Sequence, residues 1–139
     1  MLATFSAAGL FVSLAVPSSA DVVIPAQKKA TAKNSYVLAA CMVNIDRANF
    51  NGTVFGHITG QSQSNGLLSG LVQKQQVFCT VKDQGGNVIT EFDPTSGSAT
   101  LIATRQYFQS AQPTTYTVCV RSVQQLFGGG IAATPLVCV

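Results

Sequence analysis

The chain has 139 residues, of which 47% are hydrophobic and 9% are charged. That length suits one domain with its own core, the apolar composition excludes a disordered chain, and the scarcity of charge argues against a coiled coil. Eight basic and five acidic residues give a net charge of +3, which is too small for a typical nucleic-acid-binding protein.

Residues 1–20 have the features of a secretory signal peptide. They contain no charged side chain, and the mostly apolar run 2–16 is followed by Pro17 and by small residues up to Ala20, as at a signal-peptidase site. A membrane anchor or a buried helix is the less favoured alternative, because the run is shorter than the roughly 20 apolar residues of a spanning helix. We therefore expect a secreted protein that works outside the cell or at its envelope, without stable membrane insertion.

Residues 21–33 have no clear period and contain three lysines, Lys28, Lys29 and Lys33. We interpret this segment as an N-terminal arm or an edge strand. Its basic cluster either faces an anionic surface or keeps the chain soluble, and the second interpretation is favoured.

Residues 34–139 contain short strands separated by turns. The runs rich in β-branched and aromatic residues are 35–45, 53–59, 67–73, 76–82, 88–92, 99–108, 115–123 and 131–139. Clusters of Gly, Pro, Asn and Asp, such as 83–87, 93–97 and 128–130, separate these runs. About seven to nine strands in a single domain predict an antiparallel β-sandwich or a barrel.

The four cysteines are expected to form two disulfides. Cys41, Cys79, Cys119 and Cys138 are even in number and follow the signal, as in proteins of an oxidising compartment. Zinc is the competing interpretation, but no pair has the usual close spacing and the chain has one histidine. We expect no metal and no cofactor.

The strand register chooses among the three pairings. If Gly128 and Gly129 form a two-residue turn, the two residue numbers of each facing pair add up to 257. Cys119 then faces Cys138 across the hairpin. The same register pairs Val118 with Val139, Val120 with Val137, and Leu126 with Ile131 on the opposite face. Cys41 is then left for Cys79, and both lie in phase with apolar neighbours. A longer glycine loop that shifts the register is the alternative.

Two stretches carry a resemblance to a known class. Residues 81–88, Val-Lys-Asp-Gln-Gly-Gly-Asn-Val, are similar to the strand–turn–strand of bacterial immunoglobulin-like domains. Residues 116–120, Tyr-Thr-Val-Cys-Val, resemble the strand of immunoglobulin-type sandwiches in which Tyr precedes Cys. The resemblance implies a small secreted immunoglobulin-like β-sandwich, and it implies nothing about function.

The residues that could carry catalysis are few. His57 is the only candidate general base, and neither a nucleophile nor an orienting carboxylate lies in a local motif beside it. Glu91 and Asp93 at a strand end, with Asp83 at a turn, could serve a glycosidase or bind Ca²⁺. A structural histidine, a solvated edge and a capped turn are the favoured interpretations, so we expect that the protein is not an enzyme.

Other polar and aromatic features bear on binding. Glutamines in or near the strands (Gln73, Gln75, Gln76, Gln106, Gln109, Gln112, Gln124 and Gln125) either hydrogen-bond a glycan or face water, and the second is favoured. Four phenylalanines near turns, Phe50, Phe55, Phe108 and Phe127, would mark a contact patch if they cluster. Asn51 begins an Asn-Gly-Thr glycosylation motif, which matters only in a eukaryotic source.

These observations favour a secreted, non-catalytic protein that binds or coats an extracellular or cell-envelope target. Its partner would be an extracellular protein or a glycan, and unpaired edge strands could join it into a homo-oligomer. The binding loop we favour is Phe127, Gly128, Gly129 and Gly130. A secreted inhibitor or toxin-like effector that uses a disulfide-braced loop is the second hypothesis, and a small secreted hydrolase is the third.

Overall fold

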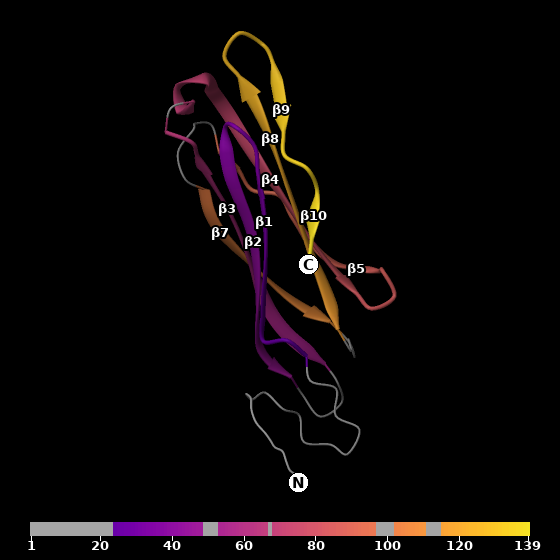
Figure 1. Ribbon diagram of the computed structural model, residues 1–139. Coiled ribbons are helices and arrows are strands. Elements are labelled where there is room, and N and C mark those ends of the chain that lie inside the picture. The colour runs from indigo at the N-terminus through magenta and orange to yellow at the C-terminus, as the bar shows by residue number, and fades with distance from the viewer. Residues whose placement is uncertain (1–23, 49–52, 67, 97–101, 111–114) are drawn as a thin grey trace.

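The computed structural model describes residues 24–48, 53–66, 68–96, 102–110 and 115–139, so the expected signal peptide lies outside the described residues. The described residues form two antiparallel sheets that pack face to face (Figure 1). The two-layer sandwich expected from the short strand runs is therefore confirmed. No helix in this part of the chain is long and apolar enough to cross a membrane.

One sheet has four strands and the other has six. The four-stranded sheet has the order β1-β2-β3-β7, with β1 (Gln27–Lys33), β2 (Val37–Ala48), β3 (Val54–Ser64) and β7 (Ile102–Ser110). In the six-stranded sheet the order is β10-β8-β4-β5, with β6 beside β4 and β9 beside β8. Its strands are β4 (Val72–Asp83), β5 (Val88–Phe92), β6 (Thr95–Ser96), β8 (Tyr116–Leu126), β9 (Ile131–Ala133) and β10 (Val137–Cys138). The chain crosses between the sheets after β3, β6 and β7, an architecture compatible with immunoglobulin-like sandwiches.

Some strand boundaries differ from the prediction. The separate strand expected over 67–73 is wrong, because the 3-10 turn η1 (Ser69–Leu71) is followed by β4, which runs without a break to Asp83. The last expected strand, 131–139, divides into β9 and β10 around Pro135. Together with the two-residue β6, this division gives ten strands in the described residues.

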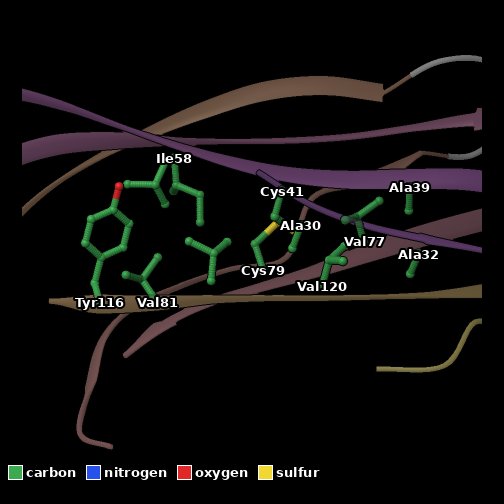
Figure 2. Close-up of a cluster of buried hydrophobic side chains, with 12 residues drawn as sticks. Ala30, Ala32, Ala39, Cys41, Ile58, Val77, Cys79, Val81, Tyr116 and Val120 are labelled. Atoms are coloured by element: carbon green, nitrogen blue, oxygen red, sulfur yellow. A yellow bond between two sulfur atoms is a disulfide. The ribbon is translucent and has the colours of Figure 1, made fainter. Parts of the chain in front are cut away.

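The core lies between the sheets and is built from small and β-branched side chains. Figure 2 shows the Cys41–Cys79 bridge in the middle of this layer, with valines, alanines and Ile58 around it. Cys41 belongs to β2 and Cys79 to β4, and their side chains are 0% and 1% exposed. The bridge, with a Cα–Cα distance of 5.6 Å, therefore ties one sheet to the other, and the expected pairing is confirmed.

The final hairpin confirms the second pairing and corrects the turn. Cys119 faces Cys138 and forms the second disulfide, while Val120 faces Val137. Near the turn, however, Gln125 faces Ile131, so the expected Leu126–Ile131 pair is wrong. Gly129 N–H donates to Leu126 O (3.1 Å) and Leu126 N–H to Gly130 O (2.8 Å). The turn therefore has three residues, and one extra residue between β9 and β10 restores the predicted register at the cysteines.

Strand β1 is fastened to the sandwich at its edge. The Lys28 ammonium donates to Tyr116 O (2.6 Å) and lies 5.2 Å from the centre of the Tyr116 ring. The Tyr116 hydroxyl donates to Pro25 O (2.8 Å), and burial raises the pKa of Tyr116 to about 12. The Lys28 ammonium therefore has its partner within the fold, whereas Lys29 and Lys33 remain exposed.

Gly56 marks a close approach inside the four-stranded sheet. A Cβ at Gly56 would lie 2.7 Å from the backbone oxygen of Asn44 and 2.8 Å from the Phe108 ring. We expect Gly56→Ala to lower the free energy of unfolding by about 2 kcal/mol, since the backbone oxygen cannot swing aside as a side chain can. Urea unfolding monitored by circular dichroism measures this, with Gly66→Ala, where no atom lies within 4 Å, as control. Equal effects in the two variants would contradict the steric argument.

Candidate functional site

The predicted binding loop, Phe127 to Gly130, forms the end of the β8–β9 hairpin. Figure 1 shows the β8–β9 connection projecting past the neighbouring strands at one end of the sandwich. Gly128 and Gly129 have φ angles of +93° and +96°. Residues with a side chain rarely adopt such angles, so this turn requires glycine. Phe127 N–H donates to Leu71 O (3.0 Å), which joins the hairpin to η1.

Large apolar side chains are exposed around this turn. Leu71 is 47%, Phe127 60% and Ile131 72% exposed, and together they define what we name the tip patch. The phenylalanines near turns do not form one exposed cluster among the described residues, because Phe55 and Phe108 are half-buried in the four-stranded sheet. Leu71 could not be found by sequence reasoning, since its place beside Phe127 depends on pairing between β4 and β8.

A shallow hollow of about 200 Å³ continues the tip patch onto the six-stranded sheet. Ile131 belongs to both features. The other outward-facing residues of the hollow are the apolar Val123 and three polar ones, Lys74, Gln76 and Gln125. The end of the sandwich therefore offers apolar surface next to hydrogen-bonding groups, which is the usual composition of a binding site.

Two glutamines expected to face water are instead buried beneath this end. Gln124 is 0% exposed; its side-chain amide donates to Ser122 Oγ (2.8 Å), and its oxygen accepts from Asn34 Nδ2 (2.7 Å). Gln75 is equally buried, and its side-chain oxygen accepts from the Ser62 hydroxyl. The expectation of solvated glutamines is wrong at these two positions, where hydrogen bonds between the sheets replace those to water.

His57 does have a carboxylate partner, which the sequence did not reveal. Its Nδ1 lies 2.9 Å from Asp46 Oδ2, and its ring is 5.6 Å from that of Tyr107. A β-bulge in β2, between Ile45 and Arg47, inserts Asp46 as an extra residue near His57. Among the described residues, Asp46 is the only side chain that shares a hydrogen bond with His57.

The other carboxylates have separate roles. Asp83 Oδ1 accepts the N–H groups of Gly85 and Asn87, each at 2.9 Å. The hydrogen bond from the backbone of Asn87 has the largest effect, and together these bonds lower the pKa of Asp83. Glu91 and Asp93 line a second hollow of about 360 Å³. Within the described residues, no group of three or more His, Cys, Asp or Glu side chains is placed to hold a metal ion.

The second disulfide lies at the far end of the hairpin from the predicted binding loop. Cys119 and Cys138 close the base of the hairpin, on the outer side of the six-stranded sheet. Phe127 follows Cys119 by eight positions, or about 25 Å of extended strand. The bridge therefore braces the whole hairpin rather than its turn. Asn51, the glycosylation candidate, and Phe50 lie outside the described residues.

Comparisons with known proteins add little to this geometry. No family model and no curated protein matches the sequence. A glycosyl hydrolase family 2 (GH2) member from Bacteroides cellulosilyticus DSM 14838 is similar over 70% of this chain and 14% of its own, with 9% identity and a TM-score of 0.42. A protein named pT26-6p is similar over 81% of this chain and 23% of its own, with 12% identity and a TM-score of 0.43. The chain thus spans less than a quarter of either protein, and neither likeness assigns it an activity.

Proposed function

We propose that this protein is a secreted, non-catalytic module that binds a protein target outside the cell through the tip patch. The observation that carries the proposal is the exposure of Leu71, Phe127 and Ile131 together at one end of the sandwich. Contiguous apolar surface is costly to leave in water and commonly marks an interaction site. A partner that covers these three side chains would remove this cost. The two disulfides and the compact sandwich support a role outside the cell.

The support beneath the tip patch favours binding with little loss of entropy. The hairpin is closed at its base by Cys119–Cys138 and held near the turn by the buried side chain of Gln124. Thr134 adds a further tie, because its hydroxyl oxygen accepts the N–H of Ser122 (2.9 Å). A surface that is already ordered loses less conformational freedom when its partner binds.

The variant Phe127→Ser/Ile131→Ser tests the proposal. We expect retention of the target from culture medium and envelope extracts to fall at least about tenfold, because the tip patch loses its two most exposed side chains. Val88→Ser is the control, since Val88 is 51% exposed at the start of β5, outside the tip patch. The proposal would be wrong if both variants retained the target equally. It would also be wrong if the reduced and alkylated protein retained as much target as the folded protein. Near-stoichiometric inhibition of an extracellular protease by the intact protein would identify that target and favour the inhibitor hypothesis.

A further inference from the structure

The outer face of the four-stranded sheet concentrates positive charge. The strand register places Lys29, Met42, Thr59 and Arg105 side by side in one row across β1, β2, β3 and β7. Arg47 lies opposite Phe55 near one end of this face, and Lys33 lies at the other end. The only described acid on this face is Asp46, so four cations against one acid give +3. The outer face of the six-stranded sheet has Lys74, Lys82 and Arg121 against Glu91 and Asp93, or +1.

The cations of this face are free to meet a partner. Lys29, Arg47 and Arg105 are exposed, and none of them forms an ion pair with a carboxylate in the described part of the chain. Asp46 is held by His57 instead. We name the surface formed by these three cations, with Phe55 and Tyr107, the basic face.

The spacing of the charges defines the shape of the partner. Lys29 and Arg105 are three strand spacings apart, about 14 Å, and Arg47 lies about 13 Å from their row along the strands. One small anion cannot reach all three cations across a flat sheet. A partner that uses them must be extended and must carry negative charge at intervals.

Aromatic rings lie between these charges. Tyr107 is 69% exposed and belongs to the same strand as Arg105. The Arg47 guanidinium lies 4.3 Å from the centre of the Phe55 ring, which holds the cation against the sheet. Flat rings and guanidinium planes offer apolar faces on which the C–H face of a sugar ring can rest, while Lys29 and Arg105 meet its acidic groups.

We infer that the basic face binds an acidic polysaccharide, a chain of sugar rings that carries carboxylate or sulfate groups. Duplex nucleic acid is a poorer fit, because reading a groove requires a projecting helix or ribbon and this face consists of paired strands within one sheet. Anionic membranes are generally held by clusters of about four to eight basic residues in one short segment, whereas these cations are spread over three strands. The basic face and the tip patch are on different sheets, so this inference stands apart from the proposed function.

The test uses Lys29→Gln/Arg47→Gln/Arg105→Gln in the full-length mature protein. The probes are dextran sulfate, polygalacturonate and uncharged dextran of matched length, with duplex DNA and phosphatidylglycerol vesicles as competing anions. The control is Lys74→Gln/Lys82→Gln/Arg121→Gln, which removes the same three charges from the opposite sheet. The replaced side chains are exposed except for Lys82, which is half-buried, so we expect both variants to keep the circular dichroism spectrum of the parent.

The parent protein should bind at least one of the two acidic polysaccharides and leave uncharged dextran unbound. The basic-face variant should bind about tenfold more weakly, as expected for the loss of three exposed charge contacts, and the control less than about twofold. Tyr107→Ser should also weaken polysaccharide binding. Because this substitution removes no charge, the contribution that is lost should not depend on the salt concentration. Equal losses in both triple variants would show a mere net-charge effect and overturn the inference. Tighter binding of DNA or vesicles than of either polysaccharide would overturn it as well.

Discussion

Replacing Cys41 and Cys79 with alanine is expected to lower the free energy of unfolding by about 4 kcal/mol, the largest effect of any change considered for this protein. The bridge closes a sequence separation of 38 residues, so its loss returns much conformational freedom to the unfolded chain. Both sulfur atoms are buried between the sheets, so the variant also leaves an unfilled space in the core. Domains are stable by only about 5–15 kcal/mol, and this loss would bring unfolding close to ambient conditions.

The measurement is urea unfolding followed by far-ultraviolet circular dichroism, which suits a chain without tryptophan. The matched variant is Cys119→Ala/Cys138→Ala, whose bridge spans 19 residues within one hairpin. We expect it to cost about 3 kcal/mol, because the closed loop is shorter. A larger loss for the hairpin bridge than for the bridge between the sheets would contradict this ranking.

The sequence predicted both disulfides because a strand pattern carries its own geometry. Alternation of apolar residues fixes which side chains share a face, and one turn assignment then fixes which residues are opposite. The assumed turn was one residue too short, yet Cys119 still met Cys138. Two local errors cancelled, since the extra residue of the turn is balanced by another near Pro135. A register that is checked against a pair far from the turn, such as Cys119 and Cys138, is therefore safer than one predicted from the turn alone.

The buried glutamines show where sequence reasoning fails. A glutamine in a strand normally faces water, and although Gln124 is in phase with Val118 and Val120, the sequence around it offers no hydrogen-bond partner that would allow it to be buried. Its partner Asn34 is 90 residues away and belongs to the β1–β2 turn. Such a pair becomes visible only when the two sheets are placed on each other, because no local pattern encodes it.

The contact between His57 and Asp46 escaped prediction for a related reason. The β2–β3 hairpin could be expected from the sequence, but the bulge that adds Asp46 beside His57 could not. Bulges depend on how a strand twists over its neighbours rather than on a residue signature. The tip patch was half predicted: the hairpin turn with Phe127 was visible in the glycine run, whereas Leu71 was assigned to a strand that does not exist.

Gln124→Met is expected to lower the free energy of unfolding by about 3 kcal/mol. Methionine fills nearly the same volume, but the half-buried Asn34 amide loses its hydrogen-bond acceptor, and the buried Ser122 hydroxyl keeps only its bond to Gln76 O. A partner group left buried and unsatisfied costs about 1–3 kcal/mol. Gln125→Met is the control, since Gln125 is the next residue, points outward and is exposed. Urea unfolding of both variants measures the difference.

A double-mutant cycle with Asn34→Ala separates the Gln124 hydrogen bonds from simple packing. Asn34 accepts the N–H groups of Tyr36 and Val37, at 2.8 and 3.0 Å, so its loss also weakens the β1–β2 turn. If the Asn34–Gln124 bond contributes as the 2.7 Å distance indicates, the double variant should be about 1 kcal/mol more stable than the sum of the single losses predicts. Strict additivity would mean that the two side chains act independently. The Asn34–Gln124 hydrogen bond would then contribute nothing to ordering the end of the sandwich that carries the tip patch.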